Sequence, residues 1–160
     1  MESKNKTNYK IGESNYFTSK EINFIKKTVL KAGEVNISHF DNLIYKNPIL
    51  ILYPNPKTPK AVGALKIPNT TYRNKVFNKA NTSKNPEKFK YELGWIVSLE
   101  VGNGKIITKI LSEFKPYIYA TVRDENKKMI NILEQLNFKK IGKSYQSERD
   151  DYLIGLYIKE

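Results

Sequence analysis

The chain has no cysteine, a single histidine (His39) and three arginines among its 160 residues. The absence of cysteine excludes a disulfide scaffold, a zinc finger and a thiol nucleophile. One histidine cannot supply a multi-histidine metal site, so we predict a protein that uses no metal ion. His39 stands in a stretch of helical periodicity and is more typical of a helix surface than of a catalytic base.

Long apolar runs are also lacking. The longest, Ile49–Tyr53, is far shorter than the ~20 residues that a membrane-spanning helix needs. The polar first ten residues do not resemble a signal peptide. A chain of 160 residues, 39% hydrophobic and 12% aromatic, can bury a core of its own. We therefore predict one cytoplasmic domain over residues 1–160, a monomer or homodimer with no membrane partner.

Positive charge is concentrated in the first part of the chain. Residues 1–90 carry 17 basic and 6 acidic side chains, whereas residues 91–160 carry 11 and 10. A field of one sign favours a polyanionic partner such as a nucleic acid. The alternative is a bias in amino-acid usage, because 25 lysines stand against three arginines and base-reading proteins rely on arginine.

One basic segment also carries aromatic residues that suit nucleic-acid binding. The segment alternates Tyr72, Arg73, Lys75, Phe77 and Lys79. Cationic side chains of this kind contact phosphates while aromatic rings stack on bases. We therefore consider Tyr72 and Arg73 candidate substrate-binding residues.

Hydrophobic periodicity predicts a mixed α/β sheet with helices packed on it. Helices are expected over residues 19–32, 38–45, 106–114 and 126–136. Strands are expected over 49–53, 61–67, 91–99, 117–122, 138–145 and 152–158. Strand–helix–strand units in the second half imply parallel pairing there, and hairpins imply antiparallel pairing elsewhere. Residues 68–90 show little periodicity and are predicted to form a long connection of the kind that is often functional.

A glycine-containing turn, Gly102-Asn103-Gly104, follows the strand over residues 91–99 and opens a helix. The first turn of a helix presents unpaired backbone N–H groups and the positive end of the helix dipole, which together attract an anion such as a pyrophosphate. Gly-x-Gly after a strand is a weak signal by itself, and a plain tight turn is an equal alternative.

The region downstream resembles a known family. The strand Ile118–Val122 is followed by a helix that opens at Asn126, then by Asn137-Phe138 and Gly142. This order resembles the end of the GNAT superfamily of N-acetyltransferases, in which a strand, an Asn-started helix and a Gly-Phe turn recur. Val97 matches the end of the family's central strand, and Val101–Phe114 its pyrophosphate loop and helix. The resemblance implies an α/β (α+β) fold: a mixed, mostly antiparallel twisted sheet with a splayed central strand pair and helices on both faces.

The resemblance also implies an activity, acyl-CoA-dependent N-acyl transfer from acetyl-CoA to an amine acceptor. In such a reaction the amine attacks the thioester directly, and a general base must first remove a proton from the ammonium. Family members often carry a Glu near the start of the central strand, where Glu92 stands here; Glu100 is a weaker candidate. Leu133 replaces a Tyr that protonates the leaving thiolate in many members, so Tyr145 or water is expected to supply that proton.

The residues that the resemblance assigns to the acetyl-CoA site lie mainly between the central strand and the next helix. They are Ile96, Val97, Ser98, Leu99, Gly102, Asn103, Gly104, Lys105, Ile106 and Ile107, together with Asn126, Met129 and Leu133 in the following helical unit.

The sequence departs from the family at the pyrophosphate loop. The family's Arg/Gln-x-x-Gly-x-Gly/Ala reads Gly-Asn-Gly-Lys-Ile-Ile over residues 102–107. This register places Ile106 on the buried face, whereas sliding it to match the glycines would bury Lys109. Lys105 or Lys109 would then compensate as a phosphate contact. The alternative function is a GNAT-fold module that binds nucleic acid or another partner without CoA chemistry; for an enzyme, the acceptor is either acidic or nucleic-acid-linked, or a protein or small amine.

Overall fold

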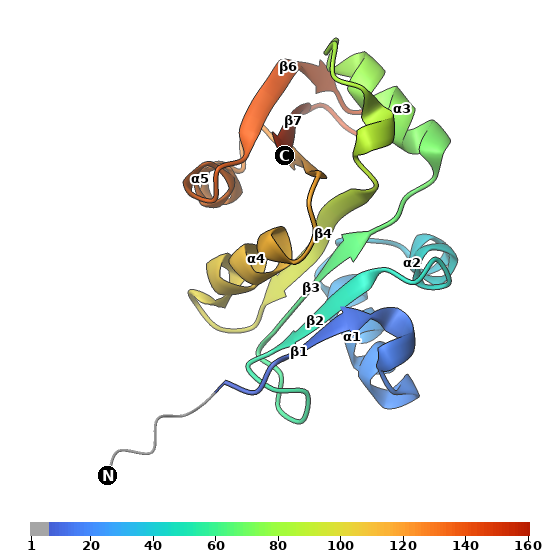
Figure 1. Ribbon diagram of the computed structural model, residues 1–160, viewed down its shortest axis with the longest axis vertical. Helices are drawn as coiled ribbons and strands as arrows, with labels where there is room; N and C mark the ends of the chain where they lie inside the picture. Colours follow the sequence, from blue (N-terminus) through green and yellow to red (C-terminus); the bar gives the residue numbers. More distant parts are fainter. Residues whose placement is uncertain (1–6) are drawn as a thin grey trace. The chain divides into compact units, whose positions relative to one another are not determined.

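The structure is a computed structural model that describes residues 7–160 (Figure 1). Its strands form one seven-stranded sheet in the order β1-β2-β3-β4-β5-β7-β6. The strands are β1 (Lys10–Glu13), β2 (Ile49–Tyr53), β3 (Ala61–Lys66), β4 (Tyr91–Ser98), β5 (Ile118–Arg123), β6 (Lys139–Gln146) and β7 (Leu153–Lys159). The helices are α1 (Ser19–Lys31), α2 (Ile37–Ile44), α3 (Thr70–Lys79), α4 (Asn103–Phe114) and α5 (Lys127–Gln135), with short 3₁₀ turns at Ser14–Tyr16 and Pro86–Lys88. The chain divides into two compact units, residues 7–65 with 94–111 (unit 1) and 66–93 with 112–160 (unit 2).

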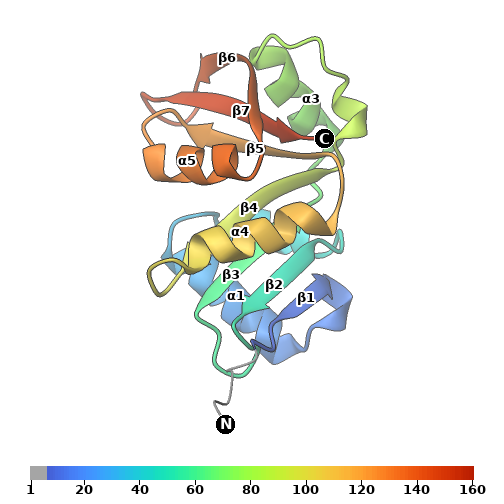
Figure 2. The same ribbon diagram turned by 60° about the vertical axis from the view of Figure 1, so that its left-hand side comes forward.

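Unit 1 is a layered structure with helices on both faces of its strands. β1, β2 and β3 pair antiparallel, with Leu50 opposite Ala64. Because side chains alternate along a strand, one face of β2 and β3 packs against α1 and α2. On the other face a Cβ at Gly63 would lie 2.8 Å from Ile96 Cδ1 and 3.0 Å from Leu111 Cδ1 of α4, so the glycine lets these side chains pack closely against β3. In Figure 2, α4 crosses one face of these strands and α1 lies behind the other.

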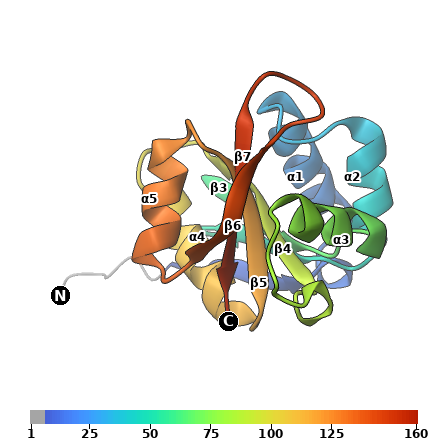
Figure 3. The same cartoon turned by 90° about the horizontal axis from the view of Figure 1, so that it is seen from above.

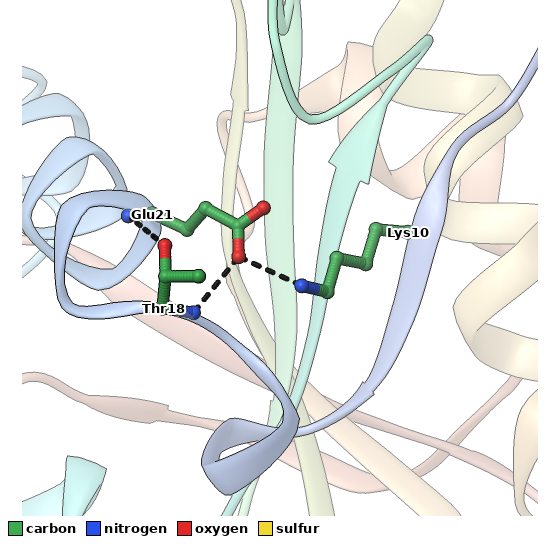
Figure 4. Close-up of polar contacts among 3 residues, drawn as sticks. All are labelled: Lys10, Thr18 and Glu21. Atoms are coloured by element: carbon green, nitrogen blue, oxygen red, sulfur yellow. Dashed lines mark hydrogen bonds and ion pairs between the residues drawn. The ribbon is translucent and has the colours of Figure 1, made fainter.

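A local polar contact joins the first strand to the first helix (Figure 4). The Thr18 hydroxyl accepts a hydrogen bond from the Glu21 N–H, and the Glu21 carboxylate accepts one from the Thr18 N–H, which is a complete capping box. Lys10 of β1 donates to the same carboxylate at 2.7 Å. Although burial opposes it, the hydrogen bonds from Lys10 and Thr18 lower the pKa of Glu21. The strand at Lys10–Glu13 was not predicted from the sequence, because its KIGE segment shows no alternation.

Unit 2 consists of β5, β7 and β6 with a helix on each side (Figure 3). β5 pairs antiparallel with β7, and β7 with β6. The start of β4 pairs parallel with β5 through Tyr91–Ile118 and Glu92–Tyr119. Both pairs lie at the start of the eight-residue β4, within unit 2. The prediction of a mixed, mostly antiparallel sheet is confirmed.

The predicted connection over residues 68–90 is wrong, since it contains α3. This helix buries only Val76 and Phe77 within its own bounds, and no side chain caps its N-terminus. One buried turn among polar residues gives little helical periodicity, so the sequence pattern could not reveal it. α3 packs through Phe77 against Phe89 and Tyr119, with ring centroids 5.4 Å apart in both pairs.

The predicted starts of two other helices need correction. α2 begins at Ile37, because Asn36 rather than Ser38 accepts the capping hydrogen bond from the His39 N–H. α4 begins at Asn103, inside the predicted glycine turn. Its buried face consists of Ile107, Thr108, Leu111 and Ser112. Ile106, which was expected on that face, is 41% exposed.

A glycine in β6 permits close contact with the end of α3. The β6–β7 register shifts between Ile141 and Tyr145, and Gly142 takes a φ of 64° there. The Ala80 carbonyl accepts a hydrogen bond of 2.8 Å from the Lys143 N–H. A Cβ at Gly142 would lie 1.9 Å from that carbonyl oxygen. The bulge therefore depends on glycine both for its backbone conformation and for the space beside Ala80.

We predict that Gly142→Ala lowers the free energy of unfolding by about 2–4 kcal/mol, since it combines left-handed strain with a steric clash. Gly33→Ala is the matched control: its φ is 74°, but nothing lies within 4 Å of the added Cβ. The free energy of unfolding of the control should fall only by the cost of the left-handed backbone strain, about 1–2 kcal/mol. Urea unfolding of both variants measures the difference, and equal losses would contradict the close contact with Ala80.

Candidate functional site

Glu92, the predicted general base, is a buried carboxylate at the start of β4. Only 3% of the residue is exposed. One carboxylate oxygen, Oε1, forms an ion pair with Lys66 Nζ at 2.7 Å. The other, Oε2, is buried and has no hydrogen-bond partner within the described part of the chain. Because a buried charge needs a partner, Lys66 supplies the compensation that lets the carboxylate occupy this position.

Three tyrosines surround this carboxylate. Tyr119 lies beside Glu92 on β5, as its partner in the parallel ladder, and its buried hydroxyl has no hydrogen-bond partner within residues 7–160. Tyr145 of β6 is half-buried and packs against the same core. Tyr72 of α3 precedes the buried Val76 by four residues, so the two side chains share one face of the helix. We call Lys66, Tyr72, Glu92, Tyr119 and Tyr145 the Glu92 cluster.

The phenols of the cluster are held in their neutral form. Burial raises the pKa of Tyr72, and the negative charge of Glu92 raises it further. The same two causes, in the same order, raise the pKa of Tyr119 and of Tyr145. Arg73 opposes the shift at Tyr119 by its positive charge. All three hydroxyls therefore carry a proton throughout the neutral pH range, beside a carboxylate that can accept one.

The structure thus brings together residues that the sequence suggested separately. Glu92 and Tyr145 were predicted to be catalytic, and Tyr72 to bind substrate; all three belong to unit 2 and to one cluster. Lys66 and Tyr119 were missed. The register pairing of Glu92 with Tyr119 and the ion pair with Lys66 depend on long-range pairing. No motif in the sequence indicates either contact.

The predicted pyrophosphate turn lies in unit 1, between β4 and α4. Val101 is fully exposed, and Gly102 takes a φ of 93° with open space where a Cβ would lie. α4 starts at the next residue and has no acidic side chain in its first turn. Lys105 and Lys109 are exposed. The first N–H groups of α4 thus follow an open glycine turn, an arrangement that suits an anion.

Nearby contacts fix the end of β4. The Leu99 N–H donates to the Lys60 carbonyl at 2.7 Å, and the Ser98 hydroxyl donates to the Glu100 carbonyl. Glu100 forms an exposed ion pair with Lys60 at 3.5 Å, so its weaker candidacy as a base gains no support from burial. Leu99 is itself exposed and belongs to the segment Ile96–Leu99 that the resemblance assigns to acyl-CoA.

Trp95 has an unusual backbone conformation inside β4. Its φ is 55°, a region that large residues rarely adopt, while its ring is buried and stacks on Phe40 with centroids 4.6 Å apart. The buried, stacked indole thus accompanies an irregular backbone conformation within β4. Strain of this kind persists where the surrounding structure enforces it, and it is frequent at functional sites.

The remaining cofactor candidates have structural contacts of their own. Asn126 caps α5 by accepting a hydrogen bond of 3.2 Å from the Met129 N–H. Met129 is half-buried. Leu133, at the family's Tyr position, is fully buried in the core of unit 2, so its side chain presents no surface to a ligand.

The basic segment around α3 offers less to a nucleic acid than its sequence suggested. Phe77 is 2% exposed and packs in the core, so it cannot stack on a base. Lys75 and Lys79 both pair with Glu148. Hydrogen bonds from Lys75 and then Lys79 lower the pKa of Glu148 to about 2. Arg73 donates to the side chain of Asn74.

No group of three or more His, Cys, Asp or Glu side chains within residues 7–160 is placed to hold a metal ion. No helix in this range is long and apolar enough to cross a bilayer. His39 is exposed on α2. The candidate chemistry of the described residues therefore centres on the Glu92 cluster and on the β4–α4 turn.

We predict that Lys66→Met destabilises the fold by about 3–5 kcal/mol, since it leaves the Glu92 carboxylate buried without its cation. Adding Glu92→Leu should recover most of this loss, because a matched apolar pair removes the stranded charge. Lys60→Met is the control: its ion pair with Glu100 is exposed and should contribute at most about 1 kcal/mol. Denaturant unfolding measures all three. A Lys66→Met loss no larger than that of Lys60→Met would show that Glu92 does not depend on Lys66.

No family model and no curated protein matches this chain. Among solved structures, an acyl-CoA N-acyltransferase from Pseudomonas aeruginosa matches with a TM-score of 0.65 at 12% identity, covering 96% of this chain and 99% of that one. NAA60 of Arabidopsis thaliana in complex with acetyl-CoA gives 0.61 at 10% identity, covering 94% and 97%. A GNAT-family acetyltransferase from Bacillus cereus gives 0.59 at 8% identity, covering 95% and 96%. The chain therefore has the fold of the GNAT acetyltransferases.

Proposed function

We propose that the protein is an acyl-CoA-dependent N-acyltransferase, which transfers an acetyl or similar acyl group from acetyl-CoA to an amine. The observation that carries the proposal is the Glu92 carboxylate, buried at the start of β4 with one oxygen paired to Lys66 and the other unused. A buried carboxylate with an unsatisfied oxygen is costly to the fold and is typical of a functional site. The shared fold of solved acyl-CoA transferases supports the same reaction class.

The chemistry needs no covalent intermediate on the protein. The acceptor nitrogen attacks the thioester carbonyl, its N–C bond forms, and the C–S bond then breaks to release the CoA thiolate. An amine is protonated at neutral pH and must lose a proton before it can attack. Glu92 is the terminal acceptor of that proton. The chain's lack of cysteine is compatible with this direct transfer.

Tyr145 is the proposed source of a proton for the leaving thiolate. Its raised pKa keeps the phenol protonated at neutral pH, so a proton is present. The charge of Glu92 disfavours the phenolate that donation would leave behind. Once Glu92 has taken the proton of the acceptor, that negative charge is neutralised, and Tyr145 becomes a stronger acid. The two residues would therefore act in sequence, base first and acid second. The second proton that the acceptor nitrogen loses as the amide forms would then restore the Tyr145 phenol.

The acyl donor is assigned to unit 1. The backbone of Ile96–Leu99 would hold the acyl and pantetheine groups, and the turn and first helical residues over 102–107 would hold the pyrophosphate. The open Cβ position at Gly102 and the helix start at Asn103 fit a phosphate group. Lys105 and Lys109 are exposed near the same helix start and would add positive charge. The thioester of the bound donor supplies the electrophile for the reaction.

We predict that acetyl-CoA raises the thermal unfolding temperature, because a ligand at 100 times its Kd stabilises a protein by about 2.7 kcal/mol. The control ligand is S-acetyl-N-acetylcysteamine, which has the thioester but no nucleotide, and it should give no shift. A transferase that binds its donor through the pyrophosphate turn should bind acetyl-CoA but not the analogue without a nucleotide. Equal responses, or no response to millimolar acetyl-CoA, would exclude the proposed donor site.

Catalysis is tested with a panel of primary amines that includes amino acids, polyamines and a short peptide. A thiol reagent reports released CoA without background, because the protein has no thiol of its own. We expect Glu92→Gln to lower kcat by about 10²-fold or more for the best amine, the usual contribution of a general base. Acetyl-CoA binding should be unchanged. Full activity of Glu92→Gln at neutral pH would remove Glu92 from the reaction.

A further inference from the structure

Glu92 is too deeply buried to touch an acceptor amine directly. The residue is 3% exposed, Oε1 is paired with Lys66, and Oε2 is buried. A general base must lie within hydrogen-bond reach of the proton that it removes, or act through one intervening group. If Glu92 accepts the proton of the acceptor, another group must carry that proton inward.

Tyr72 is the member of the cluster placed to do this. Tyr119 is fully buried and Tyr145 is half-buried, whereas 43% of Tyr72 is exposed. Tyr72 is therefore the tyrosine of the Glu92 cluster that is most exposed to solvent. Its place on α3 follows from packing: Phe77 of the same helix contacts the ring of Tyr119, and Tyr119 lies beside Glu92 in the parallel ladder. Tyr72 shares the helix face of Val76, one turn nearer the start of α3.

We propose that Tyr72 is a catalytic residue that relays the proton of the acceptor ammonium to Glu92. The inference rests on the proposed N-acyltransferase function and assigns a role within it. In the relay, an N–H bond of the ammonium breaks as its proton binds the Tyr72 oxygen. The original O–H bond of Tyr72 breaks as that proton binds Glu92 Oε2. The products are a neutral amine, an unchanged phenol and a protonated carboxyl, so charge and protons balance.

The surroundings of Tyr72 fit a relay better than a base. Burial and Glu92 both raise the pKa of Tyr72, so its hydroxyl remains protonated and can donate while it accepts. Oε2 accepts no hydrogen bond from the described residues and is free to receive the Tyr72 proton. Catalytic hydrogen bonds of this kind are often long without substrate and shorten when it binds. Lys66 is a positioning residue, since it holds Oε1 and leaves Oε2 for the relay.

The first experiment needs no acceptor. The protein is labelled with ¹³Cζ-tyrosine, and the Tyr72 signal is identified by its loss in Tyr72→Phe. We expect this signal to keep its neutral-phenol shift to higher pH in the native protein than in Glu92→Gln, because Gln removes the charge that opposes ionisation. An unchanged Tyr72 titration in Glu92→Gln would overturn the relay.

The second experiment measures kinetics with two acceptors. The best primary amine of the panel must lose a proton before attack, whereas hydroxylamine is already unprotonated at neutral pH. We expect Tyr72→Phe to lower kcat for the amine by about 10²-fold or more with the KM for acetyl-CoA unchanged, and to spare hydroxylamine. Tyr117→Phe, which also deletes one partly exposed hydroxyl, should retain activity with both. Equal losses with both acceptors in Tyr72→Phe, or no loss, would overturn the relay.

The double variant separates a relay from two independent effects. Substitutions of residues that act as one unit have strongly non-additive effects on kcat. The double variant Glu92→Gln with Tyr72→Phe should therefore lower kcat little more than either change alone. Multiplicative losses of kcat would contradict a shared path.

Failure of the proposed function is distinguishable from failure of the relay. If acetyl-CoA does not bind, or binds without any panel amine being acylated, the transferase itself is excluded; normal transfer by Tyr72→Phe excludes the relay alone.

Discussion

The ion pair between Lys66 and Glu92 is the contact on which the candidate chemistry depends. A carboxylate that is nearly inaccessible to water would be expelled or neutralised without a cation at 2.7 Å. The ion pair fixes Oε1 of Glu92 and leaves Oε2 buried without a hydrogen-bond partner among the described residues. An apolar pair of similar volume would hold these strands at lower cost, so the persistence of a charged pair here is better explained by chemistry than by stability.

Around that pair, the packing of unit 2 sets which groups surround the carboxylate. The Gly142 bulge brings β6 against Ala80 at the end of α3. The Phe77–Tyr119 contact fixes the face of α3 that lies on the sheet. Together they place phenols from α3, β5 and β6 near one charge, and burial first, then that charge, raises the pKa of each phenol and keeps it protonated. The electrostatics of the site thus follow from ordinary packing constraints on three separate segments.

Much of the fold could be predicted from the sequence, because the strands over 49–53 and 118–122 and the helices over 19–31 and 127–135 have strong periodicity. α3 could not be predicted, since its single buried turn, Val76 and Phe77, is surrounded by polar residues. The left-handed Trp95 gave no local signal either; packing on Phe40 imposes it. The resemblance pointed to Glu92, and the departure from the family at Leu133 led to the prediction of Tyr145 or water as the acid. Lys66 and Tyr119 join them through long-range pairing, which sequence spacing does not encode.

The central claim is that an ionised carboxylate beside Lys66 accepts the acceptor's proton, and chemical rescue tests it most directly. Glu92→Ala leaves a cavity next to an unpaired ammonium, which favours entry of a small carboxylate. The account predicts that added formate restores acetyl-CoA-dependent CoA release in Glu92→Ala in a saturable manner and leaves the native enzyme unaffected. A folded Glu92→Ala protein that binds acetyl-CoA but stays at its residual rate in formate would contradict it.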